Sequence, residues 1–436
     1  MVQVANFREL VQAITAEATE ITITRNIIAL HSLKLPAGVV LNGAVQENLA
    51  VPMLLFTASD GIGVTSNNQI RNLNIQTAVD QRAIYNAGQT EDLGSFVFED
   101  LTIVGQFSFI MRAGSLWAAL SLDNVNIVAA DARKYLEQPQ KYGVNVLQGA
   151  LTVYNFNPNA DSRIKLKAQH LTIGQKNAPV IGSGVFISGA GDQGGRVEVS
   201  MLMTNHVYST GLIPEGVANI ITGAIFIVYG AYAKEIVQHG ETVTYGVNDM
   251  VLDAWGSVDH WRVNGPVTSY GPSGIGFVNF GIVNRIEFTA AIQTFGLGAR
   301  GYNQYDGTLR EGIFQSIETF GDGSIGIQIS KEVGQLHVRG HLTTHGSVGR
   351  SLVKGVLQQL PAYAISVKSG GHVENLAIAG DVCTTGAKVT SISVENQAEI
   401  DAFSISGEVA TRGQNSQALM VADDAVVPPL DFDFTK

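Results

Sequence analysis

Residues 242–246 are Thr-Val-Thr-Tyr-Gly, and similar motifs return at a regular interval through the second half of the chain. The glycine of the motif recurs with a 25-residue period, as Gly246, Gly271, Gly296, Gly321 and Gly346. The residue before each glycine is aromatic or histidine, in the order Tyr245, Tyr270, Phe295, Phe320 and His345. A fixed period of this length is typical of repeat architectures, in which one structural unit is stacked on the next.

Within each 25-residue unit, apolar residues alternate with polar or small ones. Ile325, Ile327 and Ile329 follow this period of two, and Leu336 and Val338 repeat it in the same unit. A period of two predicts β-strands, and a unit of this length holds two to three short strands with their turns. Each unit therefore predicts one coil of a parallel β-solenoid. Weaker copies extend the pattern to residues 70–75, 98–103, 122–127, 197–201, 376–382 and 403–409.

The composition agrees with stacked coils and excludes several other classes of protein. Charged residues make up 15% of the 436 residues, and 48 residues are glycine; ordinary soluble domains have about 25% charged residues. A hydrophobic content of 45% excludes disorder, and the single cysteine, Cys383, excludes a disulfide scaffold. Because a solenoid grows by adding coils, we expect a single-domain protein despite the length.

The two ends of the chain differ from the repeat. Asn6 can cap a helix over residues 7–18, with Leu10, Val11 and Ile14 on one face. A solenoid exposes its core at the ends unless it is capped. We therefore predict an N-terminal cap helix within residues 1–20, a parallel β-helix over 21–425 and a C-terminal tail over 426–436. An ordinary surface helix is the alternative for the first segment.

Net charge and hydropathy limit the kinds of partner. The formal net charge is −11 with 27 basic residues and no basic run, which argues against nucleic acid. The longest apolar stretch, residues 220–233, is too short to span a bilayer, so we expect no membrane insertion. Arg8 and Glu9 stand where the apolar core of a signal peptide would begin, so the first residues are not expected to be a signal peptide. The oligomeric state is left open.

The N-terminal helix, the strands after it and the Leu-x-Ile coils resemble the right-handed parallel β-helix superfamily that includes pectate lyases. The resemblance covers nearly the whole chain at the level of architecture. It implies an all-β, single-stranded right-handed parallel β-helix whose coils follow the 25-residue period. It also implies an extracellular protein that acts on polysaccharides, by lyase, hydrolase or epimerase chemistry. Phage tailspikes and non-catalytic surface proteins share the architecture, and fold does not determine function. A cytoplasmic protein is the alternative for location.

The short motifs of the superfamily are present only in fragments. Arg163-Ile164-Lys165 matches one polygalacturonase segment without its companions. Asp259-His260 matches a pectate-lyase pair, but the arginine segment that accompanies it is missing. We predict no metal site and no cofactor. Calcium is the one cation considered, because it takes oxygen ligands and three aspartates lie near one another in sequence, namely Asp249, Asp253 and Asp259.

One face of the predicted solenoid is rich in charge. Residues 25 apart stack about 4.8 Å apart, which would place Arg285 directly over Arg310, with Glu311 in an inward column. Two stacked guanidinium groups favour an anionic ligand between them, and a polyuronide carboxylate would suit them. A solvated face with local ion pairs is the alternative. The predicted substrate-binding residues are His260, Arg262, Arg285, Glu287, Arg310 and His337.

A polar coil at residues 298–306 breaks the repeat, and a broken local rule in a regular array is typical of a site. Cleavage of a uronide by elimination needs a charge neutraliser and groups that move protons. Glycoside hydrolysis needs two carboxylates, and Asp306 and Glu311 are the nearest pair. An irregular coil with solvated polar residues is the alternative. Arg350 and Lys354 fall two 25-residue periods beyond Arg300 and Gln304, in the same predicted columns. The predicted catalytic residues are Arg300, Tyr302, Tyr305, Asp306, Arg350 and Lys354.

Two further features bear on a binding face. The aromatic column from Tyr245 to Phe320 is expected to be a structural stack at a turn, with a sugar platform as the alternative. Residues 211–246 and 346–386 exceed one period, and residues 129–143 form the most charged loop; such insertions tend to wall the binding face of a solenoid. We therefore predict a carbohydrate-active protein that binds or cleaves an acidic polysaccharide, with lyase chemistry ahead of hydrolysis. A non-catalytic structural or adhesive solenoid is the alternative.

Overall fold

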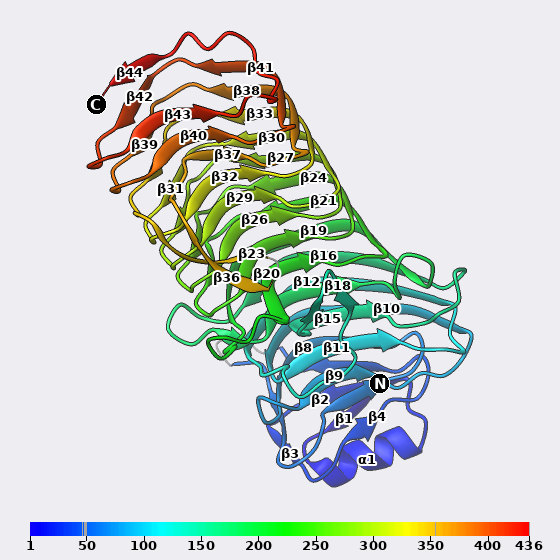
Figure 1. The fold of residues 1–436 in the computed structure, drawn as a ribbon. Helices are drawn as coiled ribbons and strands as arrows, with labels where there is room; N and C mark the ends of the chain where they lie inside the picture. Colours follow the sequence, from blue (N-terminus) through cyan, green and yellow to red (C-terminus); the bar gives the residue numbers. More distant parts are fainter. Residues whose placement is uncertain (46, 48–49, 354, 436) are drawn as a thin grey trace. The chain divides into compact units, whose positions relative to one another are not determined.

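The computed structural model describes residues 1–45, 47, 50–353 and 355–435. It is a right-handed parallel β-helix with one short helix near the N-terminus. The predicted fold class is confirmed (Figure 1). Two compact units make up the chain: Met1–Pro139, Leu147–Ser209 and Ile227–Lys234 form the first, and Gln140–Val146, Thr210–Phe226 and Glu235–Lys436 form the second. No helix in the described part of the chain has the length and apolar character that crossing a membrane requires.

The helix α1 (Phe7–Thr15) begins where the sequence predicts it. The Asn6 side chain accepts a hydrogen bond from the Glu9 N–H at 3.0 Å, which satisfies one of the unpaired amides of the first turn. The helix ends three residues earlier than expected, because Glu17 adopts a left-handed backbone with φ of 54°. Leu10 and Ala13 are buried, and α1 packs against the first strands of unit one.

In the first unit, strands of successive coils pair in parallel and form one long and one shorter ladder. The long-ladder strands are β1 (Val2–Val4), β2 (Glu20–Ile23), β3 (Ile27–Ala29), β5 (Val40–Gly43), β6 (Met53–Phe56), β8 (Gln69–Gln76), β10 (Asp92–Val104), β12 (Trp117–Ala129), β16 (Arg163–Ile173), β17 (Val180–Ile181) and β19 (Arg196–Thr210). The shorter-ladder strands are β4 (Leu33–Lys34), β7 (Ile62–Val64), β9 (Arg82–Asn86), β11 (Gln106–Met111), β15 (Gly149–Asn155) and β18 (Ser183–Ser188). Strand β21 (Ala231–Gln238) is divided between the units.

In the second unit each regular coil has three strands, and each strand pairs with its counterpart one coil further on. Ladder one contains β23 (Asp249–Ala254), β26 (Ile275–Asn279), β29 (Arg300–Gln304), β32 (Ile325–Ile329), β37 (Ile365–Val367), β40 (Thr390–Val394) and β43 (Gln417–Val421). Ladder two contains β24 (Ser257–Val263), β27 (Ile282–Phe288), β30 (Thr308–Phe314), β33 (Glu332–Val338), β38 (His372–Ile378) and β41 (Glu399–Ile405). Ladder three contains β22 (Thr242–Thr244), β25 (Val267–Ser269), β28 (Ile292–Thr294), β31 (Ile317–Thr319), β34 (Leu342–Thr344), β39 (Val382–Thr384), β42 (Glu408–Thr411) and β44 (Asp433–Thr435).

Three further strands of the second unit precede its first regular coil in the chain. They are β13 (Gln140–Lys141), β14 (Val144–Val146) and β20 (Ile220–Ile227). Strands β13 and β14 form a short antiparallel hairpin, and β14 pairs in parallel with β20. At the far end of the sequence, β44 pairs in parallel with β42, so the segment 426–436 contributes a strand to ladder three.

Close approach of neighbouring coils explains the recurring glycine. A Cβ atom on Gly271 would lie 1.7 Å from the carbonyl oxygen of Gly246, and one on Gly296 would lie 1.9 Å from that of Gly271. The next members of the column, Gly321 and Gly346, show the same geometry at 2.0 and 1.9 Å. Each turn therefore stacks backbone on backbone with no room for a side chain.

The 25-residue register is broken at one strand. Ile282 on β27 faces Thr308 on β30, one position beyond the period, and Thr308 faces Glu332 on β33, one position short of it. The turn before β30 contains three residues, 305–307, where the equivalent turns have two, and the turn after it is one residue shorter to compensate. Gly307, at φ of 62°, accommodates the extra residue.

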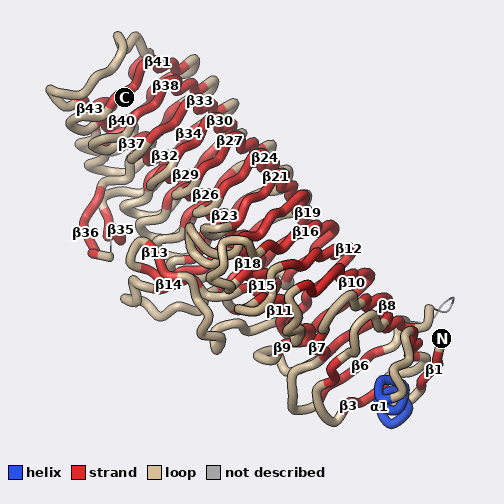
Figure 2. Tube along the Cα trace, turned by 90° about the vertical axis from the view of Figure 1, so that its right-hand side faces the viewer, coloured by secondary structure: helices blue, strands red, loops and turns tan. Residues whose placement is uncertain are grey.

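The long insertion after Gly346 contains a hairpin. Strands β35 (Gly349–Val353) and β36 (Val356–Leu360) pair with each other and form a separate two-stranded antiparallel sheet. Figure 2 shows this hairpin standing out from the coils of the second unit. The hairpin is not part of ladder one, because Ile327 on β32 pairs directly with Ile365 on β37, which follows the hairpin in the chain.

Candidate functional site

The charged face predicted to bind substrate lies on ladder two, and its columns differ from the prediction. Because β30 is displaced by one residue, Arg285 faces Glu311 and not Arg310. The predicted stacking of Arg285 over Arg310 is therefore wrong, and Glu311 is not in an inward column. Arg310 is exposed, and Gly312 takes the inward place opposite Ile286.

Most charges on this face are paired with one another. Arg285 forms ion pairs with Glu287 and Glu311, and Arg339 binds the other oxygen of Glu287 at 2.6 Å. These carboxylates neutralise Arg285, and the two guanidinium groups lower the pKa of Glu287 despite its partial burial. This arrangement matches the alternative interpretation of the face, in which its charges are solvated and form local ion pairs.

The remaining members of the predicted substrate-binding set lie along the same ladder. Arg262 pairs with Glu235, and His260 is exposed directly beside Arg285 in the neighbouring strand. His337 is half-buried and faces Ile313. None of these residues lines any of the three cavities described below, of about 410, 340 and 680 Å³.

The aromatic column is a continuous stack of rings, which confirms the structural interpretation. Successive ring centres from Tyr245 to Phe320 are 4.6–5.5 Å apart with interplanar angles of 4–17°, and His345 continues the stack. Tyr270 is 48% exposed and Phe295 is 37% exposed. Ring faces inside the column are covered by the next ring, so ring edges meet solvent there, whereas a sugar stacks on a ring face.

The three aspartates considered for calcium have different surroundings. Asp249 is buried and accepts hydrogen bonds from the Gly211 and Gly246 amides and the Thr222 hydroxyl. Burial raises the pKa of Asp249 to about 6, although these hydrogen bonds oppose the shift. Asp259 lies on β24 and accepts a hydrogen bond from Asn284. Asp253 lies on ladder one, on the wall of a cavity.

One other group has the composition of a cation site. The ligand atoms of His372, Glu399 and Asp401 lie within 4.8 Å of one another. Both ring nitrogens of His372 already face carboxylates, Glu332 at 3.0 Å and Asp401 at 3.2 Å. The hydrogen bond to Glu332, followed by that to Asp401, raises the pKa of His372. An imidazolium between two carboxylates accounts for this geometry.

The predicted catalytic residues lie in or near ladder one, but their surroundings differ. Tyr302 lies in the core, where its ring stacks on Phe277 at 5.6 Å and its hydroxyl donates to Gln304 at 2.6 Å. Arg350 lies on β35, so it does not stack two coils beyond Arg300, because β35 belongs to the inserted hairpin. Lys354 lies outside the described residues.

A cavity of about 410 Å³ brings part of this set together; we call it the central cavity. Its volume is within the range of small-molecule sites, about 300–1,000 Å³. Its floor is the face of ladder one that points away from the core, and its walls come from β13–β14, residues 218–221 and the β35–β36 hairpin. The polar and aromatic side chains of its lining include those of Tyr142, Asp253, Phe280, Arg300, Asn303, Tyr305 and Gln328.

Two hollows adjoin the central cavity. One, of about 340 Å³, shares Asn248, Ser273 and Leu352 with it and is lined by Arg350. The other, of about 680 Å³, shares Tyr142 and Tyr305 and is lined by Asp306. Arg300, Tyr305, Asp306 and Arg350 therefore belong to adjoining spaces. Asp306 and Glu311 do not share any of these three spaces, so the carboxylate pair suggested for hydrolysis is not assembled there.

Arg300 is the most unusual residue of the central cavity. It is 5% exposed, and its N–H groups donate to Gln328 Oε1, the Gly298 carbonyl and Ser351 Oγ at 2.9–3.2 Å. A guanidinium has five N–H donors, and no described carboxylate forms an ion pair with Arg300. Burial lowers its pKa to about 10, so it is a cation at neutral pH. Burying an unpaired charge is costly, and a bound anion would offset that cost.

Aromatic rings form the side of the central cavity beside Arg300. Phe280 packs on Tyr142 at 4.5 Å and on Tyr305 at 4.6 Å between ring centres. Burial raises the pKa of Tyr305, with a smaller opposing effect from Arg300, so its phenol stays protonated at neutral pH. Rings beside amide and guanidinium groups provide the mixed apolar and polar surface that is typical of small-molecule sites.

Several cavity residues are absent from the predicted site. Asp253 enters the prediction only as a calcium candidate, and Asn303 and Gln328 do not enter it. These three residues belong to one column of ladder one, in which Asp253, Val278, Asn303 and Gln328 follow one another at 25-residue intervals. The 25-residue period on ladder one is the sequence signal that identifies them. Tyr142 has no such signal, because a non-repeating hairpin carries it.

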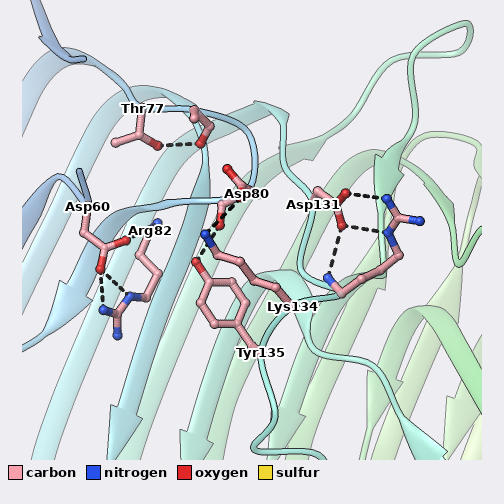
Figure 3. A network of polar contacts seen from close by, with 9 residues as sticks. Asp60, Thr77, Asp80, Arg82, Asp131, Lys134 and Tyr135 are labelled. Atoms are coloured by element: carbon pink, nitrogen blue, oxygen red, sulfur yellow. Dashed lines mark hydrogen bonds and ion pairs between the residues drawn. The ribbon is translucent and has the colours of Figure 1, made fainter. Parts of the chain in front are cut away.

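The first unit has a polar network of a different kind. Arg82 binds Asp60, and the Tyr135 hydroxyl donates to the Asp80 carbonyl at 2.9 Å (Figure 3). Lys134 pairs with Asp80 at 3.0 Å. These contacts anchor the start of the charged loop, and every charge in them has a partner, which indicates a structural role.

Comparison with known proteins found no family model, no curated protein and no solved structure that matches this chain. The fold alone defines the class of this chain, which is a parallel β-helix protein.

Proposed function

We propose that this β-helix protein is carbohydrate-active and that it binds an acidic saccharide in the central cavity, with a uronate carboxylate at Arg300. The observation that carries the proposal is the buried Arg300 guanidinium, which lines a cavity and has no described carboxylate partner. Carboxylate binding to arginine is charge-assisted and directional. The rings of Phe280 and Tyr305 would contact the sugar face, and Asn303 and Gln328 its hydroxyl groups.

The test is equilibrium binding of oligogalacturonates and oligomannuronates, with neutral oligosaccharides of equal length as the comparison. We expect only the acidic series to bind. Arg300→Gln should weaken binding by tenfold or more, because a hydrogen bond to a charged group contributes about 1.5–3 kcal/mol. The matched control is Arg310→Gln, an exposed arginine on ladder two, which should bind as the unaltered protein does. Equal binding of neutral sugars, or normal binding by Arg300→Gln, would contradict the proposal.

Cleavage by elimination is the chemistry that we propose for this site if it is catalytic. Hydroxide from solvent takes the proton next to the uronate carboxylate and becomes water, the bond to the glycosidic oxygen breaks, a carbon–carbon double bond forms, and the leaving oxygen takes a proton from Tyr305. Arg300 would neutralise the carboxylate, and the protonated Tyr305 is suited to donate to the leaving oxygen. The ultraviolet absorbance of unsaturated uronides, followed during incubation with polyuronides, measures this reaction; absorbance that does not rise with any polyuronide contradicts it.

A non-catalytic structural solenoid is the second candidate function. The observation in its favour is that the charged face of ladder two pairs its own charges, as Arg285, Glu287 and Arg339 do. If no saccharide binds and Arg300→Gln changes only stability, this candidate replaces the first.

A further inference from the structure

Asp253 is a buried carboxyl group whose oxygens have no hydrogen-bond partner in the described part of the chain. The residue has 0% exposure, both oxygens are buried, and its side chain lines the central cavity. Asp249, four residues earlier on the same strand, shows the usual arrangement, with donors to both oxygens. Buried polar atoms are nearly always satisfied in folded proteins. A ligand in the cavity would supply the hydrogen-bond partner that the described residues do not.

The other titratable groups that line this cavity are Tyr142, Arg300 and Tyr305. Asp253 pairs in register with Val278, which pairs with Asn303 on the strand that carries Arg300. Two strand spacings of about 4.8 Å separate the Asp253 and Arg300 strands. The carboxyl and the guanidinium are therefore on opposite parts of one space and form no ion pair with each other.

Burial, with no charged group to offset it, raises the pKa of Asp253 well above its ordinary value. With no hydrogen bond and no cation to stabilise the anion, the site favours the protonated carboxyl, which has one O–H donor and one carbonyl acceptor. An ionised carboxylate at the same place would repel an anionic ligand, in a medium that screens charge poorly.

We propose that Asp253 contacts the ligand directly: its neutral carboxyl donates a hydrogen bond to a hydroxyl group of the acidic saccharide held by Arg300, so that binding requires this proton. The inference rests on the proposed function and adds a specificity-determining residue to the same site. It predicts a sign for the pH dependence. Affinity is constant while Asp253 holds its proton in the free protein, and it falls up to tenfold per pH unit once that proton is lost.

The experiment measures the dissociation constant of trigalacturonate between pH 5 and 9, where Arg300 keeps its charge, for the unaltered protein, Asp253→Asn and Asp253→Ala. The Asn amide also donates a hydrogen bond but does not titrate. Asp253→Asn should therefore bind with nearly the unaltered low-pH affinity and lose the decline at high pH. Asp253→Ala should bind more weakly at every pH. Asp259→Asn, on ladder two, is the matched control and should keep the full pH profile.

The two proposals fail in different ways. If acidic oligosaccharides bind but Asp253→Asn retains the pH decline, the role of Asp253 is overturned and the proposed function stands. If no acidic oligosaccharide binds at any pH, both are overturned. Infrared spectroscopy of the ligand-free protein gives a separate readout: a protonated-carboxyl band at neutral pH should disappear in Asp253→Asn, and an unchanged spectrum would contradict the neutral state.

Discussion

At the scale of single residues, two aspartates on one strand show how local donors determine the role of a buried acid. Asp249 and Asp253 both lie on β23 and are both fully buried. Asp249 accepts hydrogen bonds from the backbone at Gly211 and Gly246, which hold the segment after β19 against the first regular coil of the second unit. Asp253 faces a cavity. The hydrogen bonds give the first a structural role, and the second is the residue that we propose as a ligand contact.

This difference predicts unequal effects of the same substitution on stability. Asp249→Asn replaces an acceptor by an NH₂ group facing amide donors, and should lower the free energy of unfolding by about 1–3 kcal/mol. Asp253→Asn removes a carboxyl that has no described partner, and should change the free energy little. Denaturant midpoints of the two variants make the comparison. Equal midpoints would contradict the structural role of Asp249.

At the scale of the elements, the turn glycines and the strand register determine which side chains meet. The glycine column lets the backbones of successive turns come into direct contact. The aromatic residues that precede these glycines then stack ring on ring. The extra residue at Gly307 moves β30 by one position and exchanges an Arg–Arg contact for the Arg285–Glu311 ion pair. Small changes in turn length thus set the charge pattern of a whole face.

The glycine column gives a test of coil stacking. A Cβ atom at position 321 would lie 2.0 Å from the Gly296 carbonyl oxygen, so Gly321→Ala should lower the free energy of unfolding by about 1–3 kcal/mol through overpacking. Gly223→Ala is the control, because its nearest neighbour is a Phe226 side-chain carbon at 3.1 Å. The measurement is the denaturant midpoint, and an unaffected Gly321→Ala would show that the turns can separate.

At the scale of the whole molecule, each coil of the β-helix contacts mainly its neighbours, so its stability is approximately a sum over adjacent pairs. The last strands illustrate this. Phe432 packs edge-to-face on Phe403 at 4.9 Å, and Val426 bridges to Glu399 on β41. These contacts of the segment after residue 425 therefore cover the last coil. Several coils separate this end of the β-helix from Arg300.

Deleting residues 426–436 should therefore have a local effect. Hydrogen exchange should accelerate in β41 and β42, which lose the partners in β44 and the Phe432 contact, and should stay unchanged in β24 and β27. Peptide-resolved exchange mass spectrometry measures both regions at once. Faster exchange throughout the second unit would contradict nearest-neighbour stability.

The repeat made much of the fold predictable. Period-two alternation identified strands such as Ile325–Ile329, and the Asn6 cap identified the start of α1, because these signals depend on local backbone geometry. The register of β30 was mispredicted, since two compensating turn lengths leave the 25-residue glycine spacing intact. Arg350 was misplaced because an inserted hairpin can match the repeat spacing by coincidence.

The sequence by itself determined the stacked-coil architecture, because each repeat unit can bury its alternating apolar face only against its own neighbours. Only the tertiary structure decided which polar residues remain available. Arg285 and Arg300 are equally prominent in the sequence, yet carboxylates on its own and the neighbouring coil pair with the first, whereas hairpins from distant segments enclose the second in a cavity with Asp253. The two hairpins come from chain segments that no repeat spacing connects to the strands of ladder one.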